Sequence, residues 1–236
     1  MSAGNVEVAA PRMRHQGPPA GVLAVVYTVL FLIGLWPVML GGKPSFPAPW
    51  ESASTMAVFF ATRAHAVQVC VFFQFGAMVV LGIFTASVVN QMRFLGVRAA
   101  GVNIALFGGL GTVFDGFAAA FAGWAMIQGG VAQIPGLTPV FYNLSFAAGG
   151  PGFSVPMGLL MLGISIPAMF MKLLPKWVTV LGMVLGVCGE LSWLTFLFPH
   201  AVFLIPLTRF PGMVWMIAAG FLLPRTVKRQ PVAGSW

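Results

Sequence analysis

Two carboxylates stand inside long apolar stretches, and they are the residues of this chain with the clearest potential for chemistry. Asp115 lies within "GTVFDGFAAA" and Glu190 lies within "VLGVCGELSWLTF". A charged side chain near the middle of a bilayer costs at least about 2.5–3.5 kcal/mol, so such residues usually face a protein interior or water. An acid in such a place can carry a proton, bind a cation, or pair with a base and so hold helices together.

Further polar residues are predicted to share the outer half of the membrane with these two acids. They are Arg63, His65, Gln74, His200 and Arg209. Two interpretations stay open. In the first, Asp115 and Glu190 pair with arginines or are protonated, and only fix helix packing. In the second, all seven residues line an outward-facing pocket that binds a ligand, with Arg and His at its mouth.

The elements that must position these residues are membrane-spanning helices. The chain is 59% hydrophobic and only 7% charged, whereas soluble domains carry about 25% charged residues. A bilayer core of about 30 Å requires about 20 apolar residues of helix. Six stretches qualify, at about 21–40, 66–89, 99–124, 152–171, 177–198 and 206–224. The predicted fold is an all-α polytopic bundle of six transmembrane helices.

The distribution of basic residues predicts the orientation of this bundle. If the N-terminus is cytoplasmic, the inner loops and the tails 1–20 and 225–236 hold nine Lys and Arg residues, and the outer side holds three, namely Lys43, Arg63 and Arg209. Cytoplasmic loops carry such an excess, so both termini are predicted to lie inside. The same distribution of basic residues accounts for the net charge of +8. Nucleic acid is not predicted as a partner, because the basic residues form no stripe with interleaved aromatic residues.

The outer connections are longer than the inner ones and are expected to be structured. Residues 41–54 contain three prolines, and residues 199–212 contain three more. Between the third and fourth spans, a short interfacial helix is predicted, broken at Gly149, Gly150 and Pro151. Loops longer than a connection requires often carry function.

Small residues accompany both acids at helical spacing. Steps of three or four residues from Asp115 reach Gly108, Gly111, Ala119 and Gly123. The same steps from Glu190 reach Gly182, Gly186, Trp193 and Leu197. Small residues let two helices approach closely. Both acids are therefore expected to face protein rather than lipid.

Several kinds of chemistry find no support in the sequence. All four lysines lie at the ends of apolar stretches, which excludes a retinal Schiff base, and three histidines are too few for a di-iron centre. Cys70 and Cys188 are isolated and lack metal-ligand spacing. We therefore predict no cofactor, no metal site and no catalytic residue.

The segments "LSFAAGGPGFSVPMGLLMLGISIPAMFMKLLPKW" and "GELSWLTFLFPHAVFLIPLTRFPGMVWMIAAGFLLP" resemble a group of uncharacterised bacterial inner-membrane proteins with six helices. The resemblance extends over nearly the whole chain and is strongest from Leu144 onward. It implies a multi-pass protein of the bacterial cytoplasmic membrane, and it implies no catalytic or binding residues.

Three classes of function follow from these observations. The favoured class is a protein that binds or transports a small molecule or lipid in an outward-facing pocket. The second is a non-catalytic subunit whose partner is another membrane protein. The third is an intramembrane enzyme that modifies a lipid with a carboxylate as general acid.

Overall fold

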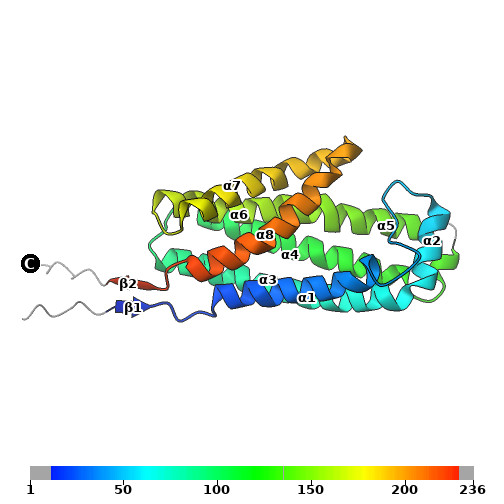
Figure 1. Ribbon diagram of the computed structural model, residues 1–236, viewed down its shortest axis with the longest axis horizontal. Coiled ribbons are helices and arrows are strands. Elements are labelled where there is room, and N and C mark those ends of the chain that lie inside the picture. Colours follow the sequence, from blue (N-terminus) through cyan, green and yellow to red (C-terminus); the bar gives the residue numbers. More distant parts are fainter. Residues whose placement is uncertain (1–11, 135, 229–236) are drawn as a thin grey trace, which may run out of the picture.

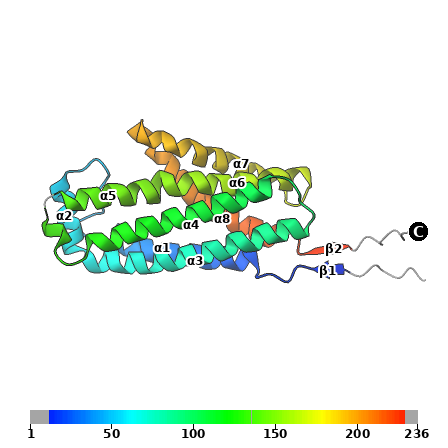
Figure 2. The ribbon, with the colours of Figure 1, turned by 180° about the vertical axis from the view of Figure 1, so that it is seen from behind.

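The computed structural model describes residues 12–134 and 136–228, which fold into a bundle of long helices (Figure 1, and from behind in Figure 2). The helices are α1 (Ala20–Met39), α2 (Ala53–Thr62), α3 (Ala64–Phe94), α4 (Gly101–Met126), α5 (Leu137–Ala147), α6 (Phe153–Phe170), α7 (Lys176–Leu191) and α8 (Leu204–Leu222). Six helical stretches are long and apolar enough to cross a membrane. This finding confirms the predicted all-α bundle of six spans and implies a lipid bilayer as its surroundings.

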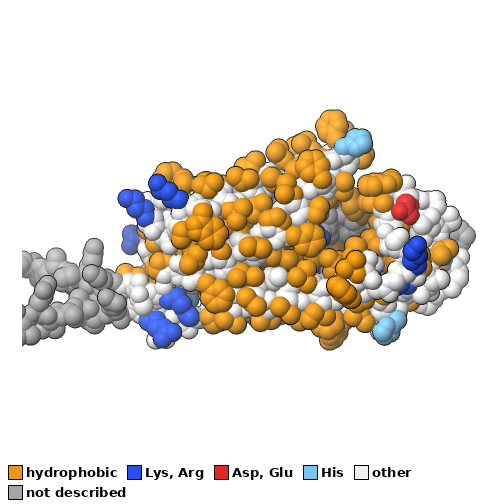
Figure 3. All heavy atoms as spheres, in the orientation of Figure 1, with side chains coloured by type: hydrophobic (Ala, Val, Ile, Leu, Met, Phe, Trp, Pro, Cys, Tyr) orange, Lys and Arg blue, Asp and Glu red, His pale blue; other side chains and the backbone are white. Residues whose placement is uncertain are grey.

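The two described ends of the chain lie side by side at one end of the bundle, here called the β-end (Figure 1). Strands β1 (Arg12–Arg14) and β2 (Thr226–Lys228) pair there in antiparallel register, with Met13 opposite Val227. The opposite end carries α2 and is called the α2 end. Lys and Arg side chains gather at the β-end (Figure 3). Parts of both predicted tails are thus strands, whereas residues 1–11 and 229–236 lie outside the described residues.

Helix α6 packs closely against α4 and α7 because glycines remove the side chains between them. A methyl group built on Gly163 of α6 would lie 2.5 Å from the carbonyl oxygen of Gly101 and 2.6 Å from the amide nitrogen of Ala105, both in α4. On the side of α7, a methyl group built on Gly158 would lie 2.7 Å from the carbonyl oxygen of Gly186. Close approach at small residues is a general route to helix association in membranes.

The fourth span differs from its prediction. A π-helical turn at Ala148–Gly152 joins α5 to α6, so that Leu137–Phe170 is one helical stretch of 34 residues. The predicted break at Gly149, Gly150 and Pro151 is wrong. A π turn contains one more residue than an α-helical turn. The wider turn accommodates the Pro151 ring, and the helix continues in the same direction. In a bilayer the chain has no water to which a broken backbone could bond, so it stays helical.

The fifth span also departs from regular spacing near its C-terminal end. Helix α7 ends at Leu191, and Ser192–Phe196 forms a 3₁₀ turn. Gly182 and Gly186 face α6 and α8 as expected, but Trp193 and Leu197 are 56% and 70% exposed. A 3₁₀ turn has 3.0 residues per turn instead of 3.6, which shifts these two side chains away from the face that Glu190 occupies.

Polar side chains of α3 attach both ends of the chain to the bundle. The side-chain amide of Gln91 donates to the carbonyl oxygens of Leu223 and Pro224, each at 3.0 Å. The side-chain amide of Asn90 lies 3.1 Å from Nε2 of His15. His15 is buried. Burial, together with the positive charge of Arg225, lowers the pKa of His15 below its ordinary value of 6.5.

We expect Gly163→Ala to destabilise the bundle because the added methyl group meets the backbone of α4. Overpacking of this kind costs about 1–3 kcal/mol, which should lower the melting temperature in detergent by roughly 3–10 °C. Gly76→Ala in α3 is the matched control, since its methyl group would have no neighbour within 4 Å. Equal melting temperatures for the two variants would contradict the close contact between α4 and α6.

We expect the stability of the bundle to fall when the pH drops below about 6.5, the pKa of an unfolded histidine. Burial lowers the pKa of His15 in the folded chain, so as the pH falls through 6.5 the unfolded chain binds more protons and is favoured. Between pH 8.0 and pH 5.5, the melting temperature should fall less for His15→Gln than for the wild type. An equal fall in melting temperature for both proteins would show that His15 does not titrate in this pH range.

Candidate functional site

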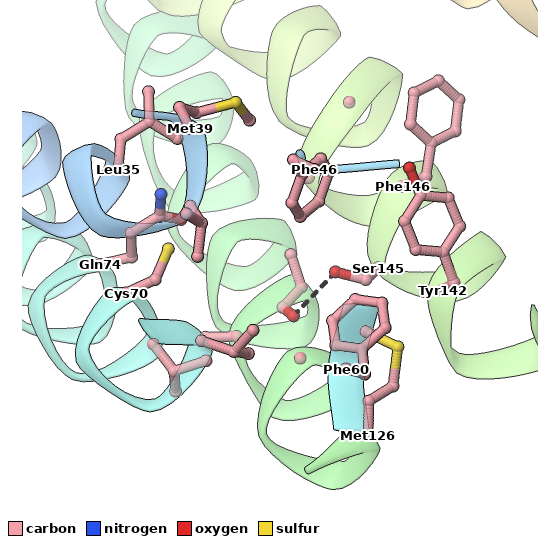
Figure 4. A pocket seen from close by; sticks show the side chains of 18 of the residues that line it. Leu35, Met39, Phe46, Phe60, Cys70, Gln74, Met126, Tyr142, Ser145 and Phe146 are labelled. Carbon is pink, nitrogen blue, oxygen red and sulfur yellow. Dashed lines mark hydrogen bonds between the residues drawn. The ribbon is translucent and has the colours of Figure 1, made fainter. Parts of the chain in front are cut away.

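A cavity of about 220 Å³ lies within the bundle near the α2 end. Its walls come from α1, α3, α4, α5 and α8, with Phe46 from the loop after α1 and Phe60 from α2. Figure 3 shows a hollow in this region, between the outer parts of α1 and α8. Figure 4 shows the labelled side chains around a central space, with Cys70 and Gln74 on one side and Tyr142 and Phe146 on the other.

Aromatic side chains close the cavity toward the α2 end. The ring of Phe46 meets Phe59 edge-on at a centroid distance of 5.3 Å and lies 6.0 Å from Tyr142. The hydroxyl of Tyr142 donates to the carbonyl oxygen of Pro47 at 2.6 Å, and Tyr142 is almost fully buried. Ring packing and this bond hold the loop after α1 over the cavity.

Arg209 of α8 is the basic residue that lines the cavity. Its guanidinium carbon lies 4.5 Å from the centroid of the Phe153 ring and 5.5 Å from that of Phe31, within cation–π range. One terminal nitrogen donates to the carbonyl oxygen of Gly149 in the π turn, and Nε is buried without a partner among the described residues. The arginine is fixed in place and retains hydrogen-bonding capacity.

The other polar groups in the cavity wall are neutral. Gln74 and Cys70 stand one helical turn apart on α3, and Ser145 stands on α5. The hydroxyl of Ser145 donates to the carbonyl oxygen of Ala119 at 3.1 Å (dashed line in Figure 4). The cavity therefore combines a mainly apolar wall with one permanent positive charge.

Arg63 and His65 lie apart from this cavity. They line a separate surface hollow together with Pro37 and Gly41. The Arg63 guanidinium donates to the carbonyl oxygens of Pro37, at 2.7 Å, and Lys43, at 3.3 Å. Because Pro37 lies in the last turn of α1, this contact places a positive charge at a helix C-terminus, where it is stabilising.

The two acids lie on different faces of the π turn and α6. A methyl group built on Gly152 would lie 3.3 Å from the carboxyl carbon of Asp115, and one built on Gly158 would lie 3.0 Å from Oε1 of Glu190. Both acids are half-buried, and neither lines the cavity. His200 is exposed in the 3₁₀ turn Pro199–Phe203. Of the seven residues proposed from the sequence, Gln74 and Arg209 meet at the cavity.

Several residues that shape the cavity were not predicted from the sequence. Phe46 and Tyr142 come from the predicted outer connections, and Phe60 precedes the second predicted span. One signal was present: Tyr142 is one of only two tyrosines in the chain. The hydroxyl of a buried tyrosine usually finds a hydrogen-bond partner.

The chain shows no significant match to protein-family models, to curated proteins or to solved structures. The function therefore has to be argued from the cavity itself.

We expect Tyr142→Phe to loosen the loop that closes the cavity. Loss of the bond to Pro47 should cost about 0.5–1.5 kcal/mol, which corresponds to roughly two- to tenfold faster local opening. Hydrogen exchange of residues 43–51 measures this change. Tyr27→Phe is the matched control, because the Tyr27 hydroxyl is buried without a partner among the described residues. Equal exchange in both variants would contradict the closing role of Tyr142.

Proposed function

We propose that the protein binds an amphipathic anion inside the membrane, with the charge of the anion at Arg209 and its apolar part in the cavity. This proposal narrows the class favoured by the sequence, the binding or transport of a small molecule or lipid. The observation that carries it is the position of Arg209, a fixed cation in the wall of a mainly apolar cavity.

The charge of Arg209 favours an anion as the ligand. In the described part of the chain, the guanidinium bonds to a carbonyl and faces two aromatic rings but pairs with no acid. These contacts stabilise the cation only in part, and a charge within a bilayer is costly until it is paired. A single cation matches a single negative charge, so a monoanion such as a carboxylate fits best.

The arrangement of α1 and α8 favours entry of this ligand from the bilayer. The two helices touch near the β-end, where a methyl group built on Gly220 would lie 2.6 Å from the amide nitrogen of Gly21. They diverge toward the α2 end (Figure 1), where both line the cavity. Exposed apolar side chains flank the divergence, with Trp36 64% and Leu207 41% exposed. An amphiphile dissolved in the membrane can reach the cavity by this route.

We also infer that the β-end faces the cytoplasm of a bacterial cell and that the cavity lies in the outer half of the inner membrane. The excess of basic residues in the predicted inner loops and tails supports this orientation. The resemblance to bacterial six-helix inner-membrane proteins supports the location.

Binding of dodecanoate tests the proposed function. With protein in nanodiscs of zwitterionic lipid, a radiolabelled dodecanoate probe should be displaced by unlabelled dodecanoate at least about tenfold more effectively than by dodecanol. A hydrogen bond to a charged group contributes about 1.5–3 kcal/mol, so Arg209→Gln should weaken binding roughly 10- to 100-fold.

Arg63→Gln is the matched control for this experiment. Arg63 lies in the same half of the protein as Arg209, but it does not line the cavity. The affinity of this variant should equal that of the wild type. Equal displacement by dodecanol and dodecanoate on the wild-type protein would refute the role of the charge without any variant. Equal weakening by both arginine substitutions would refute the assignment to the cavity.

A further inference from the structure

An open groove follows the exposed surface of α3 to the β-end of the bundle. Residues of α3 from Val79 to Asn90 line it, together with Gly17 and Pro18, which precede α1. The α3 residues recur at steps of three and four, so they share one face of the helix. From 79 to 90 the helix rises about 16 Å, which is close to half of a hydrocarbon core of about 30 Å. The groove therefore has the depth of one leaflet.

The groove changes from apolar to polar along its length. Away from the β-end its lining is apolar, with the short side chains of Gly82 and Ala86 beside the exposed side chain of Ile83. Short side chains leave room at the helix surface for an acyl chain. At the β-end the lining includes the exposed amide side chain of Asn90. A phospholipid has the same order of groups, with apolar chains toward the bilayer centre and a polar headgroup at its surface.

Arg225 places a positive charge at the polar end of this groove. Its Nη2 donates to the carbonyl oxygen of Gly17 at 2.7 Å, and Gly17 lines the groove. The main-chain carbonyl oxygen of Arg225 accepts from the amide of His15 at 2.8 Å, which fixes the residue against the segment that leads into α1. A guanidinium has five N–H donors. Because the side chain is only half-buried, its remaining donors are available to an anion at the groove.

The charges of the described residues around this end are of one sign. Arg14 is exposed in β1, where it pairs with Thr226, the residue after Arg225. Further Lys and Arg side chains gather at the β-end (Figure 3). No described acid lies in β1, β2 or the groove, since the acids of the described residues are Glu51, Asp115 and Glu190. The polar end of the groove therefore favours a negatively charged headgroup.

We propose that this groove binds an anionic phospholipid of the phosphatidylglycerol type, with its phosphate at Arg225 and one acyl chain along α3. Basic pockets at the ends of membrane helices are a common means of binding anionic headgroups. A guanidinium suits a phosphate because it can donate two parallel hydrogen bonds. The side-chain oxygen of Asn90 can accept from a hydroxyl of the glycerol headgroup. A choline headgroup would instead bring a second positive charge next to Arg14 and Arg225, which is unfavourable.

Native mass spectrometry of the full chain, released from neutral detergent micelles, tests the proposal. Phosphatidylglycerol and phosphatidylcholine with identical acyl chains are added in equal amounts. The wild type should bind its first phosphatidylglycerol at least about tenfold more tightly than phosphatidylcholine, as expected for a charge-assisted hydrogen bond. Arg225→Gln should remove this preference. Ala86→Phe should weaken the binding of both lipids, because its ring fills the path of the acyl chain.

Two matched variants separate the groove from the rest of the surface. Lys176→Gln removes a positive charge at the start of α7, and Val187→Phe adds a ring at an exposed position of the same helix. Neither residue lines the groove, and both variants should bind phosphatidylglycerol like the wild type. An equal loss of affinity in Lys176→Gln and Arg225→Gln would overturn the proposal, because it would indicate a general attraction to the basic end.

The wild type alone also provides a test that no variant can obscure. Equal retention of the two lipids by the wild type would overturn the proposal. So would displacement of phosphatidylglycerol by an equal concentration of free glycerol phosphate, since the acyl chain would then contribute nothing. Unchanged binding in Ala86→Phe would have the same consequence. Because Arg209 and its cavity take no part in this measurement, the outcome is independent of the proposed function.

Discussion

The contact of α6 with both of its neighbours at the level of the backbone is the constraint on which the rest of the structure depends. Gly163 against α4 and Gly158 against α7 leave no space for a side chain at either crossing. In lipid, where apolar burial does not drive helices together, such contacts supply much of the association energy. With α6 fixed on both sides, α4 and α7 are separated by its width. Asp115 and Glu190, one on each of those helices, consequently lie at two different sites.

The π turn at the start of α6 connects this packing to the cavity. It keeps Leu137–Phe170 helical through two glycines and Pro151. The carbonyl oxygen of Gly149 in this turn accepts a hydrogen bond from the guanidinium of Arg209. π-helical turns often occur at functional sites, because their irregular bonding leaves backbone groups available. Here the available carbonyl holds a cation inside the membrane, where an arginine without a partner would be unfavourable.

The sequence predicted the six spans because apolar length is a local property, but it misjudged irregular helix ends. The helical stretch of the fourth span begins at 137 instead of 152, because Gly149, Gly150 and Pro151 are accommodated in a π turn. Helical spacing misplaced Trp193, because the helix changes from α to 3₁₀ at Ser192. At the cavity, Arg209 and Gln74 could be named from their polarity within apolar stretches. Phe46 could not, because a phenylalanine in an apolar chain carries no signal until the fold brings it to a cavity wall.

Helix α8 joins the wall of the cavity to the packing against α7. Thr208 and Arg209 are consecutive, so their side chains point about 100° apart around the helix. Thr208 is completely buried near Gly189 of α7, whereas Arg209 lines the cavity against Phe153. The same helix touches α1 at Gly220 near the β-end and diverges from it toward the α2 end. Any change in the tilt of α8 about its contact at Gly220 would therefore alter both the width of the opening between α1 and α8 and the packing of Thr208 against Gly189.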